Sequence, residues 1–190
     1  MSNLTGTSST NISVSVQLNV DGVNYTASKV WELSARWGPS VLAMPTNVIL
    51  ETKGEAFEFT RPDGRTMFVL RRGHIGTPSP AFASEFLGCV PGKTATDSAK
   101  ALATFHGQCD LDRLTFKIVT ANEAGDLIEI PYDPKSRSPQ RVSILGVTAS
   151  TTEQPLSEGI VARHPWIKKL PHGRNGGARR TIYYEDFSRT

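Results

Sequence analysis

The side chains best suited to chemistry gather in the basic segment GIVARHPWIKKLPHGRNGGARR, residues 159–180. This segment contains six Lys or Arg residues and no Asp or Glu. Residues 161–190 carry seven Lys or Arg against two carboxylates, whereas residues 1–160 carry 14 against 16. The sequence pI of 9.0 therefore originates in the C-terminal part of the chain and not in the remainder.

Three interpretations of this segment are open. Cations release counterions from phosphates and the ring of Trp166 can stack on a base, as in a nucleic-acid-binding arm. Trp flanked by Arg is also typical of the anchors of protein interfaces. Alternatively, Trp166 and Ile167 pack on the body of the protein while the cations face water. The expected partner-binding residues are Arg163, Trp166, Ile167, Lys168, Lys169, Arg174, Arg179 and Arg180.

Other motifs predict no catalytic, cofactor-binding or metal-ligating residue. PGKT at residues 91–94 lacks the first glycine of a phosphate-binding loop, because position 87 is Leu. HGQC at residues 106–109 offers two zinc ligands, whereas a structural zinc site takes four. Glu55 and Glu58 are expected on opposite faces of a strand, which suits no acid–base pair. An enzyme with dispersed catalytic residues is left as an alternative.

The sequence contains two cysteines, Cys89 and Cys109, whose pairing the sequence leaves open. A disulfide between them would close a loop of about 20 residues and stabilise the fold by roughly 3 kcal/mol in the chain-entropy model. In a reducing cytosol they would instead be two ordinary thiols.

The clearest local signal is ISVSVQLNVDGVNYTA, residues 12–27. Apolar and polar residues alternate on both sides of Asp21-Gly22, which suits a two-residue type I′ turn. The sequence therefore predicts a hairpin with one apolar face. Its register pairs Val20 with Val23, Leu18 with Tyr25 and Val16 with Ala27.

Further elements follow from the same patterns. GEAFEFTRPDGRTMFVLRR predicts a second hairpin that turns at Pro62-Asp63-Gly64. TDSAKALATFHG predicts a helix capped by Thr96 or Asp97, and SPAFASEFLG predicts a shorter helical turn that begins at Pro80. Further short strands are predicted at residues 47–52, 113–120, 126–131, 140–150 and 181–184.

This pattern predicts a mainly β fold rather than an alternating βαβ fold. The expected architecture is an antiparallel sandwich or open barrel of about seven or eight strands, with one helix inserted near residues 97–106. Residues 1–158 are expected to form a β-rich core domain. Residues 159–190 are expected to form a basic C-terminal extension packed on that core.

No membrane span is expected, because no apolar run approaches the ~20 residues that cross a bilayer. The start MSNLTGTSSTN lacks the basic and apolar regions of a signal peptide. As written, the protein is therefore expected to be cytoplasmic. If a signal has been removed, the alternative is the bacterial envelope.

Two stretches, GEAFEF…GRTMFVLRRG and GIVARHPWIKKL, resemble a family of uncharacterised proteobacterial proteins, many of which are predicted envelope lipoproteins. The chain departs from that family's pattern because it lacks a lipoprotein signal. The resemblance implies a bacterial source and an envelope location, and carries over no catalytic or binding residue. The matching residues are Gly54-Glu55-Ala56, Phe68 to Leu70, Gly159-Ile160, Arg163, Pro165, Trp166 and Ile167.

These observations together favour a protein that works by binding. We predict a non-enzymatic protein-binding or assembly module of a bacterial or phage system, which contacts a protein partner or a second copy of itself. The alternative partner is nucleic acid, bound through residues 161–190.

Overall fold

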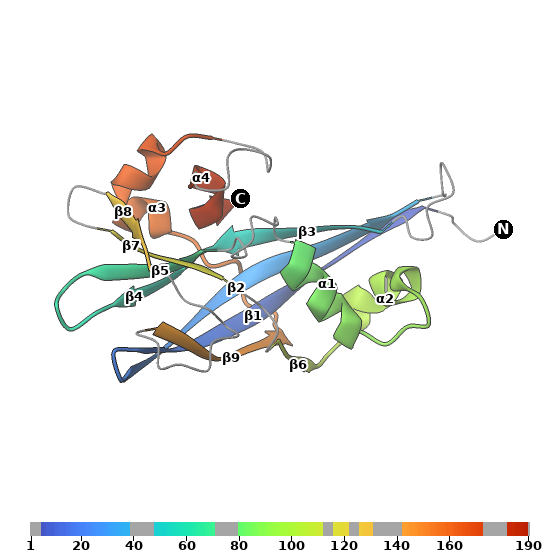
Figure 1. Ribbon diagram of the computed structural model, residues 1–190. Coiled ribbons are helices and arrows are strands. Elements are labelled where there is room, and N and C mark those ends of the chain that lie inside the picture. The colour runs from blue at the N-terminus through green and yellow to red at the C-terminus, as the bar shows by residue number, and fades with distance from the viewer. Residues whose placement is uncertain are drawn as a thin grey trace.

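Figure 1 shows the computed structural model of the chain. The structure describes residues 5–38, 48–70, 80–111, 116–121, 126–130, 142–172 and 182–189. The strands are β1 (Gly6–Val20), β2 (Val23–Trp37), β3 (Val48–Glu55), β4 (Phe57–Thr60), β5 (Thr66–Leu70), β6 (Gln108–Asp110), β7 (Lys117–Ala121), β8 (Leu127–Glu129), β9 (Val142–Thr151) and β10 (Ser188–Arg189). The helices are α1 (Pro80–Cys89), α2 (Ala95–Ala101), α3 (Ile160–Arg163) and α4 (Tyr184–Phe187), with 3₁₀ helices η1 (Leu102–Thr104) and η2 (Pro165–Lys169).

The strands form two antiparallel sheets, which confirms the predicted mainly β, sandwich-like fold class. The larger sheet has the order β10-β3-β2-β1-β9-β6, and the smaller sheet has the order β4-β5-β7-β8. Apolar side chains of both sheets, such as Val14 of β1 and Met67 of β5, belong to one buried core. This core therefore joins the two sheets face to face.

The β1–β2 hairpin confirms the register that the sequence predicts. Two 15-residue strands pair along their whole length, with Val20 opposite Val23 and Leu18 opposite Tyr25. Asp21 and Gly22 have φ values of 50° and 86°, as a type I′ turn requires. The turn and the period-two pattern agree on one register, because a slip by one residue would expose the whole apolar face.

Helices α1 and α2 cover part of the same face of the larger sheet (Figure 1). Phe82 and Phe86 of α1 and Ala99 of α2 belong to the core that contains the inward row of β1. Among the described helices, none is long and apolar enough to cross a lipid bilayer.

The predicted helix near residues 97–106 is present, but the predicted cap is wrong. Thr94 caps α2, because its Oγ1 accepts from the N–H of Asp97 at 3.2 Å, and the Asp97 carboxylate accepts from the N–H of Thr94 at 3.1 Å. This reciprocal capping box starts the helix at Ala95. The helix continues as η1 and ends at Thr104.

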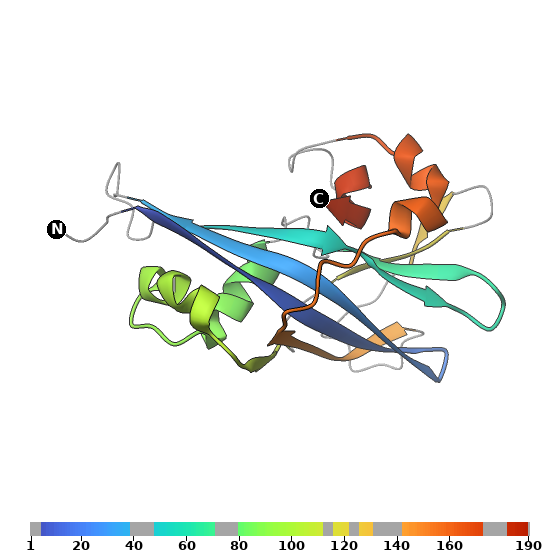
Figure 2. The ribbon, with the colours of Figure 1, turned by 180° about the vertical axis from the view of Figure 1, so that it is seen from behind.

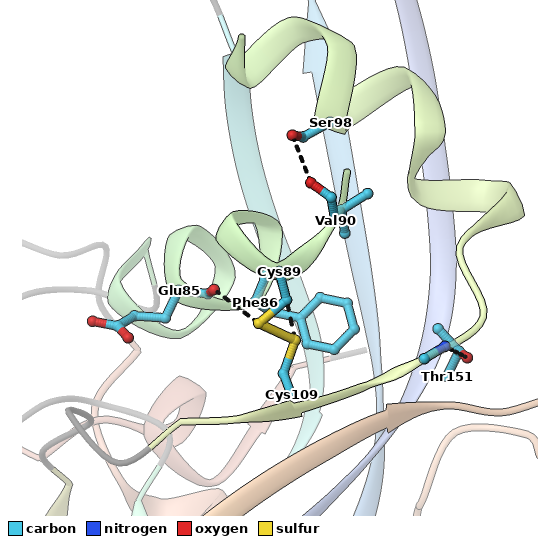
Figure 3. Close-up of a disulfide and its surroundings, with 8 residues drawn as sticks. Glu85, Phe86, Cys89, Val90, Ser98, Cys109 and Thr151 are labelled. Carbon is cyan, nitrogen blue, oxygen red and sulfur yellow. Dashed lines mark hydrogen bonds between the residues drawn. A yellow bond between two sulfur atoms is a disulfide. The ribbon is translucent and has the colours of Figure 1, made fainter. Parts of the chain in front are cut away.

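A disulfide between Cys89 and Cys109 joins the end of α1 to β6 (Figure 3). The Cα atoms are 6.1 Å apart, and Cys109 is buried beneath α1. Nearby, the hydroxyl of Ser98 donates to the carbonyl of Val90 at 2.9 Å, which fastens α2 to the chain that leaves α1. The disulfide thus connects the helical layer to the sheet, and the hydrogen bond connects the two helices within that layer.

The smaller sheet contains the second predicted hairpin, with Phe59 opposite Met67 and Gly64 in its turn at φ 78°. One face of this sheet contributes to the core shared with the larger sheet. The other face carries Phe68 and Val119 and packs against α3, η2 and α4 in a second buried cluster. The smaller sheet therefore lies between the larger sheet and the C-terminal part of the chain.

Residues 152–159 carry the chain from β9 to α3 across the back of β1 and β2 (Figure 2). Ser157 fixes this crossing, because its N–H donates to the carbonyl of Val30 at 3.1 Å and its Oγ accepts from the N–H of Val30 at 2.8 Å. β3 pairs with β2 only from Glu32 to Trp37. Ser157 therefore lies beside β2 at Val30, where β3 no longer covers its edge.

The predicted strand at residues 181–184 is wrong in the part that the structure describes. Tyr184 begins α4, because the carboxylate of Asp186 accepts from the N–H of Tyr183 at 2.9 Å and turns the chain into a helix. The last strand is instead β10, which pairs Ser188 with Glu55 of β3.

Candidate functional site

The candidate site begins where β3 gives way to β4. β3 ends at Glu55, and the N–H of the next residue, Ala56, donates to the carbonyl of Phe187 at 2.8 Å. Gly54 has a φ of 139°, a backbone conformation that favours glycine. The chain therefore changes direction between the two strands.

This change of direction places the carboxylates of Glu55 and Glu58 beside the same residue, Arg163 of α3. It therefore overturns the prediction that they lie on opposite faces of one strand. Arg163 Nη2 lies 3.9 Å from Glu55 Oε2 and 3.0 Å from Glu58 Oε2. The prediction assumed one regular strand, and the irregular step at Ala56 between β3 and β4 removes that assumption.

Glu55 is a buried carboxylate with its own partners. Its side chain is 5% exposed, and its Oε2 lies 3.2 Å from Nζ of Lys29. Its Oε1 accepts from the N–H of Ile160 at 2.7 Å. Gly159, the residue before α3, has no side chain that could cap the helix, so Glu55 serves as the cap from a distant strand. A buried charge is tolerated when it is paired and hydrogen-bonded in this way.

Glu58 is held by the two residues that end α3. Both Nε and Nη2 of Arg163 lie 3.0 Å from its Oε2, and Nε2 of His164 lies 2.9 Å from its Oε1. Burial raises the pKa of Glu58, but the hydrogen bonds and charges of His164 and Arg163 outweigh it and hold the pKa below its ordinary value. Glu58 is therefore a carboxylate at neutral pH.

Aromatic rings complete the attachment of this segment. Phe68 of β5 contacts the ring of His164 at a centroid distance of 5.0 Å and that of Trp166 at 5.8 Å. Trp166 also packs edge-on against Phe187 at 5.4 Å, and Ile167 is completely buried among them. The segment is thus fixed to the smaller sheet by apolar burial as well as by charge.

The structure distributes the predicted partner-binding residues among different environments. Arg163 is bound to Glu58, Trp166 is half-buried and Ile167 is inside the second core, so Ile167 has no surface to offer a partner here. Lys168 and Lys169 are exposed. The other three predicted residues, Arg174, Arg179 and Arg180, lie outside the described residues.

A pocket of about 300 Å³ adjoins this network. Its walls come from the end of β3, the crossing segment, α3, η2 and the C-terminal residues. Glu55, Ser157, Lys168 and Tyr184 are among its lining residues. The pocket is therefore lined by both charged and apolar residues, and among those described Lys168 is an exposed cation.

The chain matches no family model, no curated protein and no solved structure. The resemblance to a proteobacterial family therefore stays a prediction. The structure does bring the two stretches that carry the resemblance into contact, through Glu55, Glu58 and Phe68 on one side and Arg163 and His164 on the other.

The charged residues of this site mainly attach the C-terminal segment to the sheet. Glu58 and His164 form a pair able to exchange a proton, yet among the described residues no hydroxyl or thiol hydrogen-bonds to His164. In the same described part of the chain, no group of three or more His, Cys, Asp or Glu residues is arranged to hold a metal ion. Glu55 and Glu58 instead hold the C-terminal segment on the sheet.

Sequence reasoning missed the edge of β3. Ile49 is 62% exposed on the face opposite the core, next to Glu51, whose carboxylate lies 2.9 Å from Nη2 of Arg36. In the described part of the chain, β10 pairs with this edge only at Gly54 and Glu55. We call Val48–Leu50 the β3 edge. The run NVILET predicted a strand, but nothing in it indicated that the strand lies at the side of the sheet.

Proposed function

We propose that this protein is a non-enzymatic protein-binding or assembly module of a bacterial or phage system. The β3 edge provides its contact surface, together with the exposed Lys168 beside the pocket. The observation that carries the proposal is the exposure of Ile49 on β3, whose outer side pairs in the described residues only with the two residues of β10, so that an incoming strand could pair beside Ile49.

The state of the charged residues supports binding rather than catalysis. Arg163 lies within 4 Å of both Glu55 and Glu58, and Glu55 also pairs with Lys29. These ion pairs hold the C-terminal segment on the sheet, so the charges already have partners within the fold. A carboxylate with a lowered pKa, such as Glu58, is also a weak general base and is not protonated to act as an acid at neutral pH.

The edge of β3 supports strand addition in particular. β10 already pairs in antiparallel fashion with the C-terminal end of this strand, at Gly54 and Glu55. The same side of β3 therefore has a geometry that accepts an antiparallel strand. Exposed edges with apolar side chains are the usual sites of such pairing.

The disulfide supports a location outside a reducing cytosol, because structural disulfides persist in oxidising compartments. This agrees with the envelope location that the resemblance implies, and it makes a partner of the bacterial envelope the first one to seek.

The proposal is tested by capture from an extract of the encoding organism, treated with nuclease, on the intact protein. Ile49→Lys is compared with Ile128→Lys, because Ile128 on β8 is equally exposed at 61%. We expect a discrete protein that the wild type and Ile128→Lys retain and that Ile49→Lys loses. Loss of all bound material on nuclease treatment would favour the nucleic-acid alternative instead.

A further inference from the structure

We propose that the pocket beside α3 binds a free α-amino acid with an apolar side chain, held as a zwitterion by Glu158 and Lys168. The inference goes beyond the proposed protein-binding function and concerns a different surface from the β3 edge. It follows from two charges of opposite sign on the wall of one pocket, from the apolar residues beside them and from the size of the pocket.

The pocket carries one exposed charge of each sign. Glu158 of the crossing segment and Lys168 of η2 both line the pocket, and both are exposed. In the described part of the chain, neither side chain forms an ion pair with the other or with a third residue. A separate carboxylate and ammonium suit a ligand that carries an ammonium and a carboxylate of its own, because complementary charges decide which partner a site accepts.

The second carboxylate on the wall, Glu55, already has its partners. Its Oε1 accepts from the N–H of Ile160 at 2.7 Å, and its Oε2 lies 3.2 Å from Nζ of Lys29. Its side chain is only 5% exposed. Glu158 is therefore the carboxylate that can receive the ammonium of a ligand. Among the described residues that line the pocket, Lys168 is the one cation.

Both charges belong to backbone that the fold holds in place. Ser157, the residue before Glu158, forms two hydrogen bonds with Val30. Lys168 follows Ile167, which is completely buried in the second core. A site whose backbone is fixed before binding loses little conformational freedom when the ligand enters, and affinity gains from this preorganisation.

The rest of the wall selects the side chain and the size of the ligand. Leu156, Val161 and Ala162 supply apolar surface, and Tyr184 lines the pocket as well. The volume of about 300 Å³ equals that of about ten waters at roughly 30 Å³ each. A ligand of about ten non-hydrogen atoms therefore fits, as leucine or methionine does. Burial of an apolar side chain on this wall adds to the attraction between the charges.

Isothermal titration calorimetry of the full-length protein with L-leucine tests the inference. We expect saturable binding with a Kd between about 1 μM and 1 mM, because a ligand of this size reaches only a modest affinity. N-acetyl-leucine lacks the ammonium and leucinamide lacks the carboxylate. Each should bind about tenfold more weakly than leucine, since each loses one hydrogen-bonded charge pair.

Two pairs of variants assign the two contacts. Lys168→Gln should raise the Kd of leucine about tenfold and remove the preference for leucine over leucinamide. Lys169→Gln should leave both unchanged, because Lys169 is exposed but is not among the described residues that line the pocket. Glu158→Gln should in the same way remove the preference over N-acetyl-leucine. Its control is Glu153→Gln, an exposed position of the same crossing segment.

Three results would overturn the inference: no saturable binding of leucine or methionine up to about 10 mM, equal binding of leucine and both capped analogues, or equal effects of Lys168→Gln and Lys169→Gln. Equal binding of leucine and N-acetyl-leucine alone would also overturn it, and would show that the pocket takes the C-terminal residue of a peptide. The capture assay with Ile49→Lys tests the proposed function separately, so failure of the one is distinguishable from failure of the other.

Discussion

Two regions of the molecule are attached to the sheets by different means. The helical region, α1 and α2, is fixed to the larger sheet by a large apolar core and by the disulfide between Cys89 of α1 and Cys109 of β6. The C-terminal region, residues 160–170 and 184–189, is fixed by a small apolar cluster and by carboxylates that bind Arg163 and His164. Reduction should therefore loosen the first region, and acid should loosen the second.

The largest expected effect comes from Glu55→Gln. The substitution leaves the ammonium of Lys29, whose side chain is 14% exposed, without its counter-charge. Removal of one partner of a buried pair costs about 3 to 5 kcal/mol. Urea unfolding monitored by fluorescence should show this loss in the free energy of unfolding.

Glu51→Gln is the matched control on the same strand. Glu51 pairs with an exposed Arg36, and such surface pairs contribute about 0.2 to 1 kcal/mol. Equal destabilisation by the two substitutions would show that Glu55 does not carry the attachment of the C-terminal region.

Next in size is the disulfide. Replacement of Cys89 and Cys109 by Ser together should lower the free energy of unfolding by about 3 kcal/mol, because the unfolded chain regains the freedom of the closed loop. Hydrogen exchange should increase in α1 and β6 and stay unchanged in α3. A parallel increase in α3 would contradict the division into two independently attached regions.

The pH response should separate the two regions further. The folded pKa of Glu58 lies below its ordinary value of 4.5, so its contribution is complete above pH 4.5 and is lost as the pH falls through the folded pKa. Hydrogen bonds to charged groups contribute about 1.5 to 3 kcal/mol, and the exposure of Arg163 places this contribution at the lower end of that range. Unfolding curves at decreasing pH should therefore converge for the wild type and Glu58→Gln, and parallel curves would count against this role of Glu58.

The same comparison explains which parts of the structure the sequence could predict. The hairpin register follows from neighbouring residues, because a two-residue turn and a period of two allow one solution. The bond from Ile160 to Glu55 joins positions 105 apart and depends on the irregular step at Ala56. No local pattern encodes such a contact. The disulfide is an intermediate case, since its spacing was visible but its formation requires α1 to lie over β6.

The smallest expected effect concerns the residues most conspicuous in the sequence. Lys168 and Lys169 are exposed, so replacing both by Ala should change the free energy of unfolding by less than about 0.5 kcal/mol. Ile167→Ala between Trp166 and Lys168 should cost about 2 to 4 kcal/mol, because it leaves a cavity in the second core. Urea unfolding of the two variants gives their free energies of unfolding. The difference shows whether the charged or the buried side chains of this short segment contribute more to stability. A large loss from the Lys pair would mean that its charges, and not the apolar residues beside them, hold the C-terminal region in place.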